Sequence, residues 1–144
     1  MEQRYGIKYG LEQFIEYTKD QPNITPKKGY SPNDFLDWNR NIDLYYEDAV
    51  HTNPILARNL EFWSSKLKPT GVLCGDDYRP RFPDVRSGAE GLAKAFGREL
   101  ILVENFWCLL PEESVVPGAQ SVAETLRAIA AEAEAEKRKQ GFVL

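Results

Sequence analysis

The chain has 144 residues, which suits one ordinary domain and leaves no room for two. Hydrophobic residues make up 42% and charged residues 28%, enough apolar surface to bury a core, which argues against wholesale disorder. The 18 basic against 22 acidic residues, a formal net charge of −4, argue against a nucleic-acid binder held by electrostatics. Neither a membrane-spanning run nor the apolar core of a signal peptide is present, so we expect a cytoplasmic protein.

The first part of the chain favours short helices around a short strand. Apolar residues lie at helical spacing over residues 11–19, which predicts an amphipathic helix. Residues 23–25 fit a short strand ended by proline. Ser31 followed by Pro32 is typical of a helix start, with serine as the N-cap and proline at the first helical position.

A strand, a helix and a second strand follow. Residues 42–46 are a strand candidate, and Asn53-Pro54 opens a longer helix whose apolar positions reach Leu67. The sequence Lys-Pro-Thr-Gly at 68–71 ends that helix, and residues 72–74 form a short apolar strand of the kind buried on both faces. This spacing predicts a right-handed βαβ unit with two parallel strands.

A further helix and a hairpin come next. Residues 84–96 have the apolar spacing of a helix, and Gly97 suits its left-handed C-terminal end. Residues 99–103 and 106–110 are strands joined so closely that they must pair as an antiparallel hairpin.

The C-terminal region predicts one more helix. Ser121 and Glu124 fit a capping box, and the charged run at 132–139 favours a solvent-exposed end. We therefore expect a single α/β domain over residues 1–144, with residues 120–144 as the C-terminal helix and tail.

Acidic residues end both predicted parallel strands. Asp48 follows the first strand, and Asp76 and Asp77 follow the second. In an open α/β sheet, ligands bind beyond the carboxyl ends of the strands, and neighbouring strands lie about 4.8 Å apart. Crowded carboxylates favour a hard cation such as Mg²⁺, Mn²⁺ or Ca²⁺. The alternative is a polar turn at 75–78 and a capping role for Asp48.

His51 is the only histidine, three residues after Asp48. A loop histidine beside a carboxylate can act as a general base near neutral pH, although a single histidine also suits a surface or capping position. Cys74 and Cys108 fall within apolar strands and are expected to be core thiols. The sequence contains no G-x-G-x-x-G loop to hold a nucleotide phosphate.

A resemblance is carried by four segments of the chain. It resembles class I S-adenosylmethionine-dependent methyltransferases, in their C-terminal half, and most closely the small-molecule O-methyltransferases of the macrocin and mycinamicin type. The segments are IDLYYEDAVH at 42–51, LEFW at 60–63, LKPTGVLCGDDY at 67–78 and FPDV at 82–85.

The resemblance implies a fold and a chemistry. It implies a Rossmann-like sheet in the order 3-2-1-4-5-7-6, helices on both faces and a terminal antiparallel hairpin, of which this chain has strands 3 or 4 to 7. It implies Asp48, Asp76 and Asp77 as Mg²⁺ ligands that position a substrate hydroxyl. It also implies His51 as the base that deprotonates this hydroxyl, before transfer of the methyl group from S-adenosylmethionine to a sugar or other hydroxylated metabolite.

The chain departs from this family in two ways. The first strand with its glycine loop has no counterpart, so cofactor contact falls to the turn Gly29, Tyr30 and Ser31. The glycine usual after the strand-4 acid is replaced, giving Asp48-Ala-Val-His51.

The missing first strand would leave residues 42–46 as an unpaired apolar edge, which proteins avoid. We expect the N-terminal segment, a second copy in a homo-oligomer or a separate partner to cover it.

The sequence leaves three alternatives for the function. The chain is a methyltransferase-like enzyme that is incomplete on its own. It is a non-catalytic binding or assembly protein that kept the half-fold and dimerises through this edge. Or it is a truncation of a longer enzyme.

Overall fold

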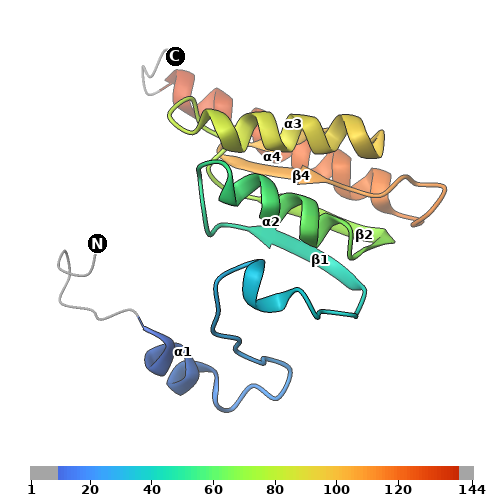
Figure 1. Cartoon of the computed structure of the whole chain (residues 1–144). Coiled ribbons are helices and arrows are strands. Elements are labelled where there is room, and N and C mark those ends of the chain that lie inside the picture. The colour runs from blue at the N-terminus through green and yellow to red at the C-terminus, as the bar shows by residue number, and fades with distance from the viewer. Residues whose placement is uncertain (1–9, 140–144) are drawn as a thin grey trace. The chain divides into compact units, whose positions relative to one another are not determined.

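The computed structural model describes residues 10–139 (Figure 1). The chain divides into two compact units, residues 1–36 and 37–144, and each is described by itself. The expectation of one domain over residues 1–144 stays a prediction, and residues 140–144 of the expected tail lie outside the described residues.

The described part of the first unit, residues 10–36, contains one α-helix and one helical turn. The predicted helix is confirmed as α1, Leu11–Thr18, but the strand expected at 23–25 is wrong. Hydrogen bonds from Gln21 N to Thr18 O and from Ile24 N to Gln21 O instead fold this segment into turns, and an isolated strand has no ladder to satisfy its backbone. The expected helix after Ser31 is a single 3₁₀ turn, η1, Asn33–Phe35.

The second unit is built on a four-stranded mixed sheet, which confirms the α/β class. The strand order is β1-β2-β4-β3. The first pair is parallel, as predicted, and the other two pairs are antiparallel, including the predicted hairpin. The strands are β1, Ile42–Glu47, β2, Leu67–Gly75, β3, Ile101–Val103, and β4, Phe106–Leu109.

The helix between β1 and β2 is shorter than predicted, and the second strand is longer. Helix α2 spans Ile55–Ser64, and residues 67–71 belong to β2 rather than to the helix and its end. Ile42 pairs with Leu67 and Leu44 pairs with Val72, so residues 68–71 form a bulge. The Arg98 guanidinium donates to the carbonyls of Pro69 and Gly71, at 2.8 and 2.7 Å, and so satisfies backbone groups that the ladder leaves free.

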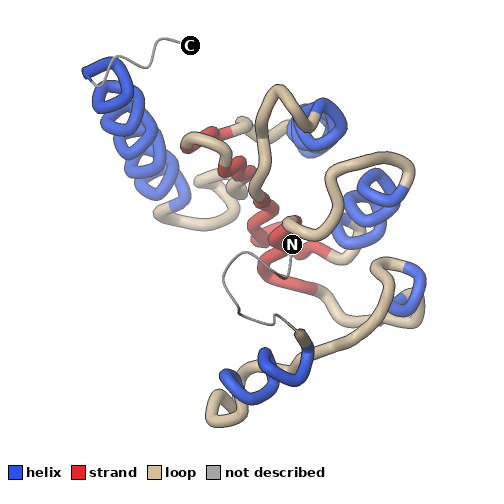
Figure 2. The backbone as a smooth tube through the Cα atoms, turned by 90° about the vertical axis from the view of Figure 1, so that its left-hand side faces the viewer, coloured by secondary structure: helices blue, strands red, loops and turns tan. Residues whose placement is uncertain are grey.

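Helices cover the sheet on two sides (Figure 2). Helix α2 and helix α3, Pro83–Phe96, pack on one face, and helix α4, Ala119–Lys139, contacts β3 on the other. The core beneath α2 and α3 joins helices and strands; its buried members are Leu56, Leu60, Leu73, Val85, Ala89, Trp107 and Leu109.

The ends of α3 and α4 show one prediction confirmed and one corrected. Gly97 ends α3 in the left-handed conformation at φ 63°, as expected. Helix α4 begins at Ala119, so Ser121 lies inside it, and the predicted capping box is wrong. The Glu113 carboxylate accepts hydrogen bonds from the backbone N–H groups of Gly118 and Gln120 instead. Among residues 10–139, no helix is long and apolar enough to cross a membrane.

Candidate functional site

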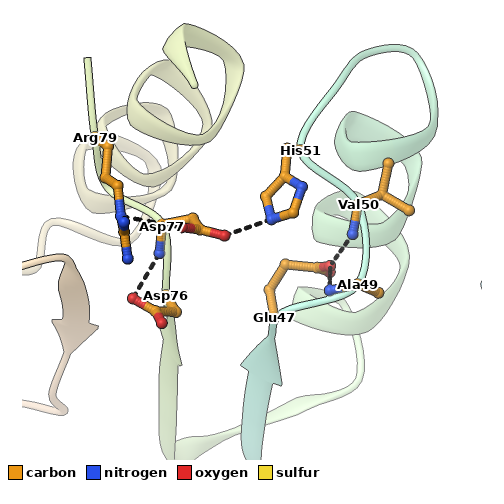
Figure 3. A network of polar contacts seen from close by, with 7 residues as sticks. All are labelled: Glu47, Ala49, Val50, His51, Asp76, Asp77 and Arg79. Atoms are coloured by element: carbon orange, nitrogen blue, oxygen red, sulfur yellow. Dashed lines mark hydrogen bonds and ion pairs between the residues drawn. The ribbon is translucent and has the colours of Figure 1, made fainter. Parts of the chain in front are cut away.

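The candidate site lies where β1 and β2 end side by side (Figure 3). The last pair of the parallel ladder is Glu47 with Gly75, and Asp76 N donates to Glu47 O at 3.2 Å just beyond it. The residues that follow both strands therefore emerge at the same edge, as the βαβ pattern predicts.

Three predicted site residues meet at this edge. Asp48, His51 and Asp77 each offer one ligand atom, and these atoms lie within 4.8 Å of one another. His51 Nε2 is 2.6 Å from Asp77 Oδ2, an ion pair when the imidazole is protonated. The His51 side chain is 35% exposed and that of Asp77 15%, while Asp48 is exposed, so the group opens to solvent.

The Nε2 atom of His51 itself is buried, although part of the ring is not. Despite its closeness to Asp77, it makes no hydrogen bond of ordinary geometry. A buried polar atom without such a bond is uncommon in folded proteins and marks a position that suits a proton or a ligand. The carboxylate oxygens of Asp48 and Asp77 suit a hard divalent cation, and the imidazole nitrogen beside them suits a general base.

Asp76 is not part of this group. Its Oδ1 accepts a hydrogen bond from Asp77 N at 2.7 Å, as Figure 3 shows. This bond lies beside a strained backbone, because Asp77 has a positive φ of 62°, where aspartate is tolerated better than most residues. In the described residues Asp76 thus orients the backbone of Asp77, and its expected role as a third carboxylate ligand stays a prediction.

Glu47 supports the loop that carries Asp48 and His51, and the sequence analysis missed it. Its buried carboxylate accepts hydrogen bonds from Ala49 N at 3.1 Å and Val50 N at 3.4 Å, and from the Tyr45 hydroxyl. Burial first, and then the charge of Glu47, raise the pKa of Tyr45. The alternation of side chains along a strand places Tyr45 and Glu47 on the same face of β1, and this pattern could have indicated their contact.

Two residues of the loop after β2 complete the site, and both were missed. The His51 ring stacks on Phe82, with 4.3 Å between centroids and 17° between planes. Arg79 Nε lies 3.1 Å from Asp77 Oδ1, so the Asp77 carboxylate faces Arg79 with one oxygen and His51 with the other. No pattern in the sequence pointed to either contact, because both depend on how the loop folds back.

The turn expected to contact the cofactor lies in the first unit. Tyr30 N donates to Asp34 Oδ2 at 2.8 Å, and a Cβ at Gly29 would meet Asp34 and Phe35 atoms at 2.9 Å. The turn is therefore tightly built, while the Tyr30 side chain is 83% exposed. Gly29, Tyr30 and Ser31 thus belong to a different unit from the group of Asp48, His51 and Asp77.

The two cysteines are core thiols, as expected. Cys74 on β2 pairs directly with Cys108 on β4, and both are free and buried. Burial, and secondly the neighbouring Cys74, raise the pKa of Cys108 to about 12. Thiols in this state are poor nucleophiles at neutral pH.

Comparisons of this chain with models of protein families, with curated proteins and with solved structures gave no match. The chemistry of the site therefore has to be argued from its own geometry.

Proposed function

We propose that this protein is methyltransferase-like and binds a divalent cation and a small hydroxylated molecule where β1 and β2 end. The observation that carries the proposal is that carboxylate oxygens of Asp48 and Asp77 and a ring nitrogen of His51 meet within 4.8 Å, which places a base beside two oxygen ligands. They gather at the carboxyl ends of adjacent parallel strands, which is where open α/β sheets bind their ligands.

The strand order supports the methyltransferase part of the proposal. The order β1-β2-β4-β3 corresponds to the run 4-5-7-6 of the family's sheet. In both sheets a parallel pair of strands is followed by an antiparallel hairpin. The second strand of the hairpin, here β4, lies next to the parallel pair, and the first, here β3, lies at the edge. A simple extension of the sheet would instead place β3 beside β2 and β4 at the edge.

In the proposed chemistry each residue of the site has one task. A bound Mg²⁺ would polarise the substrate hydroxyl and lower its pKa. Asp48 and Asp77 would supply carboxylate oxygens for the cation. His51 accepts the hydroxyl proton at Nε2, and the Asp77 carboxylate stabilises the imidazolium that results. Phe82 fixes the plane of the His51 ring.

Titration of the full chain with Mn²⁺, followed by the signal of the free ion in electron paramagnetic resonance, tests the site. We expect saturable binding that weakens by about 10-fold or more in Asp77→Asn and in Asp48→Asn. His51→Gln keeps the affinity within about 3-fold, because the histidine is the base and not a ligand. Asp43→Asn is the matched control, since Asp43 is exposed and paired with Lys68. Unsaturable binding, or an unchanged affinity in Asp77→Asn, would contradict the proposal.

The methyl donor is tested separately. Calorimetric titration with S-adenosylmethionine measures whether the chain binds the methyl donor, for which Gly29, Tyr30 and Ser31 are the proposed contacts. A dissociation constant weaker than about 1 mM would exclude methyl transfer by this chain alone and leave the metal site standing.

A second candidate function is that of a non-catalytic assembly protein. Strand β1 is outermost in the sheet of the described residues, and Leu44 and Tyr46 on it are 58% and 47% exposed. The exposed Asp43 on β1 forms an ion pair with Lys68, with 2.7 Å between Lys68 Nζ and Asp43 Oδ1. The edge therefore carries little of the net charge with which proteins oppose strand pairing. The partner that we propose is a second copy, because antiparallel pairing of the same strand is self-complementary about a twofold axis.

A further inference from the structure

Three arginines lie in the loop between β2 and α3 and in the first part of α3. Arg79 is paired with Asp77. Arg86 lies over the Tyr78 ring, 5.4 Å from its centroid. Glu90, one helical turn after Arg86, accepts a hydrogen bond from the Tyr78 hydroxyl at 2.6 Å. The Arg79 guanidinium therefore already faces the Asp77 carboxylate. The Arg86 guanidinium faces the Tyr78 ring, whose hydroxyl is hydrogen-bonded to the Glu90 carboxylate.

Arg81 differs from these two. It is exposed, and within residues 10–139 it forms an ion pair with no carboxylate. Its guanidinium lies over the ring of Phe82, 4.5 Å from the centroid. An arginine that is held flat on an aromatic ring loses little further freedom on binding and presents its fork of N–H donors to an oxyanion.

The backbone of the loop is fixed on both sides of Arg81. Phe82 N donates to Arg79 O at 3.0 Å, and Tyr78 N donates to Asn105 O in the β3–β4 turn at 2.9 Å. Phe82 is also packed against the core of the second unit. The ring that supports Arg81 is therefore part of a rigid frame and not a free surface side chain.

Phe82 connects Arg81 to the reacting end of the site. The same ring that carries the Arg81 guanidinium at 4.5 Å stacks on His51 at 4.3 Å. Laid end to end, these two distances put Arg81 no more than about 9 Å from the imidazole, within reach of one small molecule. A ligand that places a hydroxyl at His51 would need an anionic group within this distance to contact Arg81 as well.

We propose that Arg81 is the anion-binding residue of the site and that the substrate is a small hydroxylated molecule bearing a phosphate or carboxylate group. The substrate class rests on the function proposed above, whereas binding of the anion does not. The interaction is a charge-assisted, planar pairing of guanidinium and oxyanion.

The test is a titration of the full chain with inorganic phosphate and, separately, with acetate, followed by ¹H–¹⁵N NMR. We expect the Arg81 Nε–H and Phe82 amide signals to shift and saturate with at least one probe. Arg81→Gln should lose about 10-fold or more in affinity, and Arg81→Lys should fall between the two, because it keeps the charge and not the planar fork. Arg138→Gln, an exposed arginine of α4, is the matched control and should bind like the wild type.

The two probes decide between the sources of the anion: saturation by phosphate alone indicates a phosphorylated substrate, and saturation by acetate a carboxylate. Shifts that do not saturate, or that persist in Arg81→Gln, would overturn the proposal. Comparing the anion and Mn²⁺ titrations of the wild type separates this proposal from the metal site. Saturable anion binding by a wild type that does not bind Mn²⁺ keeps Arg81 and removes the proposed metal chemistry. Mn²⁺ binding without saturable anion binding removes Arg81 alone.

Discussion

At the scale of single residues, Gly75 shows how closely the site is built on the sheet. It is the last residue of β2, directly before Asp76. A Cβ at this position would lie 2.5 Å from Glu47 O and 2.7 Å from Trp107 Nε1. Neither a backbone carbonyl of the adjacent strand nor a fully buried indole can move aside easily, so only glycine lets β1, β2 and β4 converge here.

Gly75→Ala is therefore expected to lower the free energy of unfolding by about 1–3 kcal/mol through overpacking. The measurement is the midpoint of urea unfolding. Gly91→Ala is the matched control, because Gly91 lies in α3 with nothing within 4 Å of its Cβ position. Alanine is the better helix former there, so this variant should gain up to about 1 kcal/mol. Equal midpoints for the two variants would contradict the close approach at Gly75.

The site residues divide into those that local sequence predicted and those that it could not. Asp48, His51 and Asp77 follow from spacing, because parallel neighbours end at one edge. Glu47 and Phe82 were missed. A glutamate is rarely buried, so the sequence favours a solvent-exposed Glu47. The stacking of Phe82 on His51 joins positions 31 residues apart, with α2 and β2 between them.

At the scale of elements, the start of α4 depends on a residue outside the helix. The backbone N–H groups of Gly118 and Gln120 hydrogen-bond to Glu113 and hold the pKa of its carboxyl below the ordinary 4.5. Because the folded pKa is lowered, the stabilisation is present above the unfolded pKa of about 4.5 and is lost as the pH falls through the folded value.

Acid should therefore loosen the first turn of α4 in the wild type. Amide hydrogen exchange, referred to the intrinsic rate at each pH, should show protection of Gln120 that falls between pH 7 and pH 3. Glu113→Gln should show lower protection at pH 7 and little change with pH, because the amide cannot ionise. Glu132→Gln, an exposed acid further along the helix, should behave like the wild type. A pH dependence that is unchanged in Glu113→Gln would exclude this cap.

At the scale of the whole molecule, strand β1 leaves apolar side chains exposed at one edge of the sheet in the second unit. Helix α4 contacts β3 at the far end of the sheet, while Leu44 and Tyr46 remain exposed at the β1 end. Tyr46 stacks on Phe106 at 6.4 Å, so the exposed surface continues across the sheet. An apolar edge strand of this kind is a template for strand pairing.

If a second copy covers this edge, size-exclusion chromatography with light scattering should report a dimer. Leu44→Lys should convert it to a monomer, since a charge on the edge opposes pairing. Leu102→Lys, a similar change on β3 at the opposite edge, should leave the dimer intact. A wild-type monomer would exclude the assembly function through a second copy. If a different chain occupied the edge, the purified protein would likewise be monomeric.

The sequence by itself determined the α/β class, the parallel pairing of β1 and β2, the hairpin, the end of α3 and the residues that can meet at the sheet edge. These follow from local periodicity, from turn residues and from the handedness of βαβ units. Only the tertiary structure decided the bulge at 68–71, the cap of α4 and the orientation of His51 between Asp77 and Phe82. Each of these depends on a contact between residues distant in the chain or on where a backbone group finds its hydrogen-bond partner, and neither is encoded in local spacing.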